Sequence, residues 1–194
     1  MANLVDIEVY KVSEKIESSK EDARIASLIT SVSQLVKTYC GNSIVDYAAT
    51  PKTEDFHINW NTTFVQLTES PILGVISLKE RETFSSAYTT LNATDYYVDT
   101  KTDTIHRVNA NGVGKSFPTG PSAVQVIYEA GYADCPPDLQ LAVIDLITYY
   151  MKDEHKARQT IQGASIQNSA SSSQRNNVAF PDHIKRVLDL YKNF

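Results

Sequence analysis

The segment from Val124 to Arg158 constrains the fold of this chain more than any other. Its first part, Val124-Gln125-Val126-Ile127-Tyr128-Glu129-Ala130, is rich in β-branched residues and stops at a glycine, which predicts a strand. Two prolines follow, and a proline suits the first turn of a helix because its missing N–H needs no partner there. A helix over residues 138–156 is predicted because apolar side chains then recur at helical spacing: Leu139, Ala142, Val143, Leu146, Ile147 and Tyr150.

A second amphipathic helix is predicted over residues 20–39, near the start of the chain. Ser18 and Glu21 have the spacing of a capping box, in which each side chain bonds the other residue's backbone N–H. Apolar residues recur behind them at intervals of three and four, and Gly41 provides the left-handed residue that commonly ends a helix.

The middle of the chain has the pattern of short strands. Strands are predicted around residues 56–60, 63–68, 72–78 and 124–128, and residues 96–99 and 104–108 form the arms of a hairpin. Residues 109–121 are dense in Gly, Asn and Pro and are predicted to be a loop. The expected fold class is therefore α+β, with an N-terminal helix, a small antiparallel sheet of five or six short strands and C-terminal helices.

Beyond Lys156 the composition changes to small polar residues. Eleven of the sixteen residues in 162–177 are Ser, Gln or Asn, too few apolar groups to offset the entropy of ordering, so this segment is predicted to be flexible. After Pro181, a short helix is predicted to carry Ile184, Val187, Leu188 and Tyr191 on one side. Such a helix either docks on a partner or folds back onto its own domain. The expected division is a domain over 1–158, a linker over 159–180 and a docking helix over 181–194.

The sequence contains no recognisable catalytic, cofactor-binding or metal-binding motif. Gly114-Lys115-Ser116 matches the end of a phosphate-binding loop, but the glycine required five residues earlier is Asn109 and Pro118 opposes the helix that must follow. The four histidines lack ligand spacing, and no nucleophile motif is present. We therefore expect no enzymatic activity, and a surface loop around Lys115.

Charge and composition indicate a soluble protein that does not coat nucleic acid. The formal net charge is −5, whereas proteins that coat nucleic acid carry a basic excess. No apolar run approaches membrane-spanning length and no signal-peptide pattern opens the chain, so neither membrane insertion nor secretion is expected. Cys40 and Cys135 are expected to be two free thiols of a protein made in the reducing cytoplasm.

Several stretches, taken in order, resemble the head–tail connector (adaptor) proteins of tailed bacteriophages. They are residues 23–39, the strand Ser70-Pro71-Ile72-Leu73-Gly74-Val75-Ile76-Ser77-Leu78, the hairpin that starts at Tyr96-Tyr97-Val98-Asp99, the strand 124–132, and Pro136-Pro137-Asp138-Leu139 with its helix. The resemblance implies an α+β subunit that assembles as a ring of about twelve copies in the virion neck. That ring lies under the portal protein, meets the stopper or tail protein, and lets genomic DNA pass without sequence-specific binding; it has no cofactor.

The resemblance also implies that the C-terminal part of the chain binds the portal and orders on assembly. The candidate partner-binding residues are Arg158, Arg175, Ile184, Val187, Leu188 and Tyr191. Two alternatives remain open: another neck or tail-completion (head-closure) protein, and a hydrolase of unrecognised class. Ring subunits need two different matching faces, and an acidic channel lining would let DNA slide.

Overall fold

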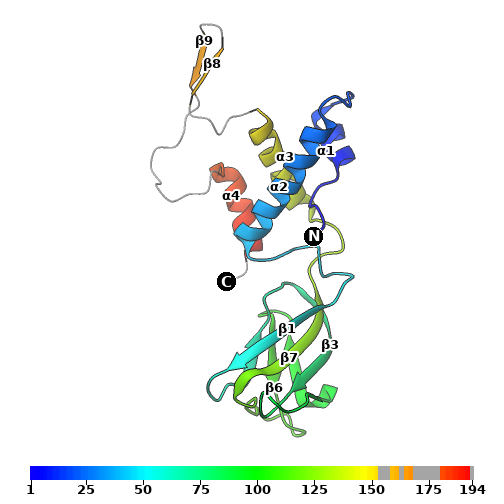
Figure 1. The fold of residues 1–194 in the computed structure, drawn as a ribbon, viewed down its shortest axis with the longest axis vertical. Helices are drawn as coiled ribbons and strands as arrows, with labels where there is room; N and C mark the ends of the chain where they lie inside the picture. The colour runs from blue at the N-terminus through cyan, green and yellow to red at the C-terminus, as the bar shows by residue number, and fades with distance from the viewer. Residues whose placement is uncertain (153–157, 162–163, 168–179, 193–194) are drawn as a thin grey trace. The chain divides into compact units, whose positions relative to one another are not determined.

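A computed structural model describes residues 1–152, 158–161, 164–167 and 180–192 (Figure 1). Within them the chain divides into two units. Residues 1–41 and 135–192 form the helical unit, and residues 42–134 form the β unit.

The described residues of the helical unit include four α-helices and one 3-10 turn. They are α1 (Ile7–Glu14), α2 (Asp22–Cys40), α3 (Pro137–Met151), α4 (Asp182–Leu188) and η2 (Asp189–Tyr191). Asp6 caps α1, because its carboxylate accepts a hydrogen bond from the Glu8 N–H at 2.9 Å. Gly41 ends α2 in the left-handed conformation, at φ +66°, as the sequence predicts.

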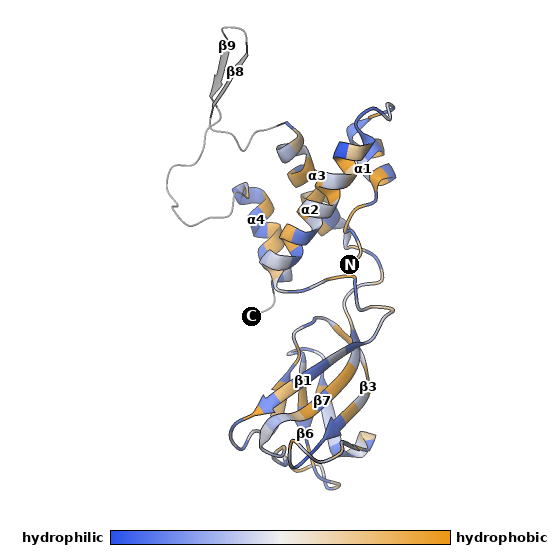
Figure 2. Ribbon diagram, in the orientation of Figure 1, coloured by the Kyte–Doolittle hydropathy of each residue, from blue (hydrophilic) through white to orange (hydrophobic). Residues whose placement is uncertain are grey.

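The core of the helical unit is built from one apolar stripe on each long helix and from two residues of α4. Figure 2 shows apolar and polar residues alternating around α2 and α3. The stripe predicted for α3 is confirmed, with Tyr150 half-buried at its end. The fully buried members of the core include Ile25, Ile29, Val32 and Val36 of α2, Leu139, Val143, Leu146 and Ile147 of α3, and Ile184 and Leu188 of α4.

Three details of the helix prediction are wrong. The capping box does not form: α2 begins at Asp22, and the Ser18 hydroxyl accepts from the Lys20 N–H instead. The sequence analysis did not predict α1, because only Tyr10 of this helix is buried and a single anchor gives no periodic signal. The helix α3 ends at Met151, short of the predicted residue 156, and residues 153–157 lie outside the described part.

The β unit contains two antiparallel sheets, where a single sheet was expected. The four-stranded sheet has the order β1 (Lys52–Ile58), β7 (Gly120–Ala130), β3 (Ile72–Glu80), β4 (Thr89–Thr90). The three-stranded sheet has the order β2 (Phe64–Gln66), β6 (Thr104–Arg107), β5 (Tyr96–Asp99), and the short turn η1 (Ala93–Asp95) precedes β5. The α+β class is thus confirmed.

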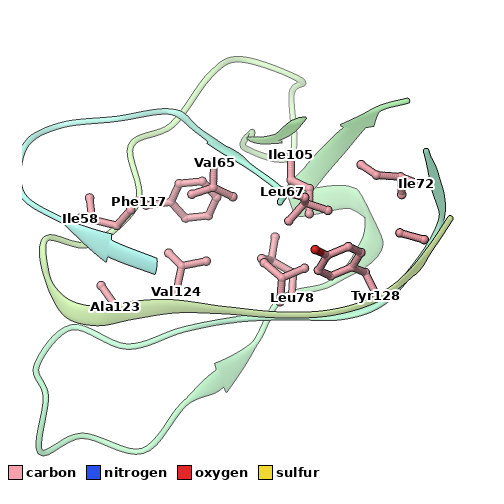
Figure 3. Close-up of a cluster of buried hydrophobic side chains, with 12 residues drawn as sticks. Ile58, Val65, Leu67, Ile72, Leu78, Ile105, Phe117, Ala123, Val124 and Tyr128 are labelled. Atoms are coloured by element: carbon pink, nitrogen blue, oxygen red, sulfur yellow. The ribbon is translucent and has the colours of Figure 1, made fainter. Parts of the chain in front are cut away.

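The inner faces of the two sheets share one hydrophobic core. Figure 3 shows Leu78, Val124 and Tyr128 of the four-stranded sheet facing Val65, Leu67 and Ile105 on the other side. Two sheets form because each strand is apolar on one side, and two such sides stacked together remove both from water. Sequence periodicity identifies the apolar side of a strand but does not assign that strand to a sheet.

The predicted strands are confirmed with shifted ends. The hairpin of β5 and β6 lies where it was expected, with Tyr97 opposite His106. β7 begins at Gly120, inside the predicted loop, and β4 was not predicted. Trp60 was predicted to lie in a strand, but it follows the end of β1 and is 74% exposed.

A short two-stranded ladder lies at the start of the expected linker, and only its second strand falls within residues 162–177, the segment predicted to be flexible. β8 (Arg158–Ile161) pairs antiparallel with β9 (Ala164–Gln167). Backbone groups form such a ladder regardless of polar side chains, which is why composition gave no signal for it. Residues 162–163 and 168–177 of the predicted flexible segment lie outside the described part, so its flexibility and the division at 159–180 stay predictions.

Candidate interaction surfaces

Three aromatic rings lie in a row on the outer face of the three-stranded sheet. Phe64 of β2 is opposite His106 of β6, and His106 is opposite Tyr97 of β5. Ring centroids are 5.6 Å apart for Phe64 and His106, and 6.3 Å apart for Tyr97 and His106. The Phe64 and Tyr97 side chains are 47% and 60% exposed. We call these three residues the aromatic strip.

The strip follows from strand alternation and is held in place locally. Val65, Val98 and Ile105 point into the core, so their neighbours point outward. The His106 ring nitrogen Nε2 lies 3.1 Å from the Thr104 hydroxyl, which fixes the ring. Cross-strand aromatic pairs of this kind stabilise a sheet and present a flat, preorganised surface.

An acidic group flanks the aromatic strip. Asp99 lies two residues from Tyr97 on the same strand, β5. The Lys101 N–H, which donates to the Asp99 carboxylate at 2.9 Å, lowers the pKa of Asp99 below its ordinary value, and nearby His106 adds to this effect. Asp99 is therefore negatively charged at neutral pH.

The four-stranded sheet exposes two aliphatic side chains on β3. Leu73 and Ile76 are 55% and 56% exposed. The pairing of β3 with β7 shifts register between Ile72 and Gly74, and again between Val75 and Ser77, so both residues lie at β-bulges. A bulge re-aims side chains and is a recurrent feature of functional strands. We call Leu73 and Ile76 the aliphatic patch.

The strip and the patch face away from each other. The core side chain Leu78 of β3 packs toward Ile105 of β6, so the shared core lies between the two sheets. Leu73 and Ile76 lie outside this core, as do Phe64 and Tyr97. The β unit therefore carries exposed apolar groups of different chemistry on opposite sides.

Two loops of the β unit enclose an open groove of about 720 Å³. One wall is the segment after β3, where the Arg81 guanidinium lies 4.6 Å from the Phe84 ring centroid and 4.5 Å from that of Tyr88. The other wall includes Lys115 and Ser116. The Lys115 N–H donates to the Arg107 carbonyl at 2.9 Å, and no helix follows before β7, so the predicted surface loop is confirmed.

The buried charged groups of the β unit hold the fold together. Glu69 is 7% exposed; its carboxylate accepts from the Ser43 hydroxyl at 2.6 Å and from Lys52 Nζ at 3.0 Å. The Tyr128 hydroxyl donates to Glu54 at 2.9 Å. Burial, together with the Glu54 charge, raises the pKa of Tyr128, which keeps this hydroxyl protonated as a donor.

The predicted partner-binding residues of the C-terminal helix are largely buried within the helical unit. Ile184 and Leu188 are 1% and 0% exposed, and α4 packs against α2 and α3. Val187 and Tyr191 are half-buried. This helix therefore folds back onto its own chain, one of the two alternatives drawn from the sequence. Arg158 belongs to β8, whose side chains are not described, and Arg175 lies outside the described part.

Polar contacts connect α4 and η2 to α2 and α3 within the helical unit. The Tyr39 hydroxyl donates to Asp189 at 2.6 Å, and the Tyr191 hydroxyl donates to Asp138 at 2.6 Å. The Cys40 thiol donates to the Leu188 carbonyl at 3.6 Å, and burial raises its pKa to about 11. Cys40 and Cys135 are both unpaired, as predicted, and burial raises the pKa of Cys135 to about 12.

Neither a metal-binding cluster nor a membrane-spanning helix occurs among the described residues. No cluster of three or more His, Cys, Asp or Glu side chains with the arrangement of a metal site occurs among them. Within the same part of the chain, every helix is too short or too polar to traverse a bilayer.

Sequence reasoning missed both the aromatic strip and the aliphatic patch. The available signal for the strip was alternation: Tyr97 and Phe64 occupy the outward positions of their strands, where polar residues are usual in a sheet with one solvated face. The signal for the patch was weaker, because the largely apolar run from Ile72 to Leu78 does not alternate regularly and so does not indicate which residues point outward. Bulge positions are set by the pairing with β7, which is not visible in the sequence.

The fold is shared with chains of gene transfer agent (GTA) particles. A chain in the neck of an empty GTA particle, computed with C6 symmetry, aligns with a TM-score of 0.62 at 14% identity and covers 98% of this chain and 90% of that chain. A chain in the neck of a native GTA particle, computed with C12 symmetry, aligns with a TM-score of 0.59 at 14% identity, and the alignment covers 100% of this chain and 94% of that chain. A chain in the virion of a native GTA particle aligns with a TM-score of 0.61 at 14% identity, and the alignment covers 98% of this chain and 90% of that chain.

At this identity the structural likeness shows the fold alone. A search of curated proteins finds no match to the sequence. A family model does match, and it extends over residues 3–194, nearly the whole chain. The model is that of the head completion protein, and this chain belongs to the head completion protein family.

Proposed function

We propose that this chain is a structural subunit of the virion neck that assembles as a ring of about twelve copies. The ring joins the portal protein to the stopper or tail protein, and genomic DNA passes through its centre. The observation that carries the proposal is the family match over residues 3–194. The shared fold with chains of necks computed with C6 and C12 symmetry supports a ring.

The surface chemistry of the β unit supports an assembly role. Among its exposed apolar residues, Phe64 and Tyr97 lie on one outer face in the aromatic strip, and Leu73 and Ile76 form the aliphatic patch on the opposite face. Exposed apolar groups that gather on a folded surface, beyond the usual scattered single residues, indicate contact with another protein. The buried charges, such as Glu69 and Arg107, are engaged in hydrogen bonds that stabilise the fold.

The net charge supports passage of DNA without binding. At a net charge of −5 per chain, a ring of twelve copies has a net charge of about −60. An acidic channel wall repels the phosphate backbone and opposes the contacts by which basic proteins hold DNA. A basic channel wall in the assembled ring would contradict this part of the proposal.

We also propose that the C-terminal segment binds the portal. Arg158, Arg175 and the half-buried Val187 and Tyr191 are the residues proposed to make this contact. The apolar side chains of Ile184 and Leu188 are buried in the helical unit, so they can contact a partner only if α4 detaches from α2 and α3. Tyr39→Phe, which removes the hydrogen bond to Asp189 at the end of α4, should ease that release and strengthen portal binding.

The alternative is a head-closure or tail-completion protein that lies further from the portal. The family name, which refers to completion of the head, favours a position at the head without specifying the neighbour. Pull-down with purified portal protein separates the two: direct binding supports the connector, and binding only to the stopper or tail protein supports the alternative.

Complementation of defective particles tests the proposed function. Heads assembled without this chain are expected to contain DNA and to lack attached tails. Adding the purified chain should restore tail attachment, seen by negative-stain microscopy. Normally tailed, infectious particles made without the chain would contradict the proposal.

A further inference from the structure

We infer that the aromatic strip of one copy binds the aliphatic patch of the next copy in the ring. This inference rests on the proposed function, because it identifies the contact by which the subunits of the neck ring join. The strip is Phe64, His106 and Tyr97, and the patch is Leu73 and Ile76. The occupant of each surface is thus a second copy of this chain.

Ring closure requires what these two surfaces provide. A cyclic assembly with more than two subunits uses a heterologous contact, in which two different faces of one subunit match each other. The strip and the patch differ in chemistry and lie on opposite sides of the shared core. One subunit can therefore use both faces at once, each with a different neighbour. Two identical patches on one side would give only a dimer.

The side chains suit each other in shape and rigidity. The strip is a row of three rings fixed by cross-strand contacts, with centroids 5.6 and 6.3 Å apart. Leu73 and Ile76 project from bulges on an otherwise regular strand. Branched aliphatic side chains pack against flat aromatic faces, and rigid partners lose little entropy on binding.

Charge fixes the orientation of the contact. Asp99, which is ionised at neutral pH, flanks the strip on β5, and Lys79 follows Ile76 on β3. Leu78 points into the core, so Lys79 points outward, as does Ile76. Glu129 lies opposite Gly74, at the Leu73 end of the patch. The Lys79 end of the patch therefore meets the Asp99 end of the strip.

The contact is small, so it acts through repetition. Full burial of one aromatic side chain removes roughly 150–250 Å² from water, and stable protein pairs bury about 1,200–2,000 Å² in total. A strip of three rings against two aliphatic residues falls below that range. The purified chain is thus expected to associate weakly, and ring closure, which makes each further contact intramolecular, stabilises the assembly.

Disulfide trapping in the purified full-length chain tests the inference. The variant Tyr97→Cys/Ile76→Cys, oxidised at about 1 mM and pH 7.5, should give a ladder of cross-linked multimers on a non-reducing gel. Equimolar mixing of the two single variants should give a heterodimer that grows no further, because each chain has one introduced cysteine on one face. The control is Tyr97→Cys/Val113→Cys; Val113 is 60% exposed in the β6–β7 loop, outside both surfaces.

The native cysteines contribute equally to test and control. Cys40 is buried, and the pKa values of Cys40 and Cys135 are raised to about 11 and 12, so few of these thiols ionise at pH 7.5. The three substituted positions, Tyr97, Ile76 and Val113, are each more than half exposed, and unchanged melting temperatures confirm folding. If Tyr97→Cys destabilises the chain, Phe64→Cys/Leu73→Cys provides a second pair on the same two surfaces.

A ladder at least several-fold stronger than that of the control supports the inference, and a ladder no stronger than the control overturns it. If cross-linking fails while the chain restores tail attachment, the neck function stands and this contact is wrong. If the ladder forms while the chain is not required for tail attachment, the neck function is wrong. If Tyr97→Cys alone cross-links to itself as efficiently as the mixture does, the strip is a dimer contact and the inference is overturned.

Discussion

Arg107 and Glu80 join the two sheets of the β unit through two parallel hydrogen bonds. Nε and Nη2 of Arg107, on β6, each lie 3.1 Å from a carboxylate oxygen of Glu80, on β3. Arg107 Nη1 also donates to the carbonyl oxygens of Asp95 and Val108, each at 2.7 Å. The arginine is 4% exposed, so this charged group is satisfied by the protein itself.

Removal of the Arg107 charge should destabilise the β unit strongly. Arg107→Met leaves Glu80 as a largely buried carboxylate without its partner, which typically costs about 3–5 kcal/mol. Urea unfolding followed by circular dichroism measures the loss. Lys101→Met, at an exposed turn position, is the control and should change the free energy of unfolding by less than about 0.5 kcal/mol. Equal stability of both variants would show that the bidentate pair is not formed.

Gly131 is predicted to tolerate no side chain. Its φ is +94°, and a Cβ atom would lie 2.2 Å from the carbonyl oxygen of Ile44. Gly131→Ala should therefore lower the free energy of unfolding by more than about 2 kcal/mol, from backbone strain plus the clash. Gly74→Ala is the matched control, because nothing lies within 4 Å of its Cβ position. A melting temperature that falls more for Gly74→Ala than for Gly131→Ala would contradict this geometry.

The buried face of α3 can be tested with two leucines of the same helix. Leu146 is 0% exposed and Leu141 is 59% exposed. Leu146→Ala should cost about 2–5 kcal/mol through lost burial and the cavity left behind. Leu141→Ala should cost less than about 0.5 kcal/mol, because little apolar surface is lost there. Thermal and urea unfolding of both variants measure the difference, and similar losses would mean that the helix faces the other way.

The contact of η2 with α3 should depend on pH. The Tyr191 hydroxyl donates to Asp138 and lowers the pKa of that carboxyl below its ordinary value. A lowered pKa in the folded state stabilises the fold above the unfolded-state pKa, and this stability is lost as the pH falls through the folded-state value. Tyr191→Phe should cost about 0.5–1 kcal/mol at pH 7, since the pair is solvent-exposed.

The same measurement at low pH completes that test. At pH 3 the Asp138 carboxyl begins to protonate, so wild type loses part of the contribution that Tyr191→Phe has already lost. The difference between wild type and variant, measured by urea unfolding, should therefore shrink from pH 7 to pH 3. A difference that grows on acidification would show that the hydroxyl stabilises the fold by another route.

Local signals in the sequence predicted most helices and strands of this fold. The stripe from Leu139 to Ile147 and the glycine at position 41 depend on neighbours along the chain, so their spacing and backbone preference are readable. Arg107 is different. Its partner Glu80 lies 27 residues away on another sheet, and nothing at either position marks the pair.

The interaction surfaces depend on pairing between distant strands. Phe64 and Tyr97 are far apart in the sequence and become neighbours of His106 only through the strand order β2-β6-β5. The fate of the last helix was equally open in the sequence, because an apolar stripe such as that of Ile184 and Leu188 suits a partner and the chain's own core alike. In the described structure α4 packs against α2 and α3, so its apolar stripe belongs to the chain's own core.

A cryo-EM map of the neck of the assembled particle tests the central claim most directly. The account predicts a ring of this chain next to the portal, at about twelve copies, surrounding the path of the DNA. In that ring the outer face of the three-stranded sheet of each subunit should contact β3 of its neighbour. A neck without density for this chain, or with a single copy beside the channel, would contradict the account.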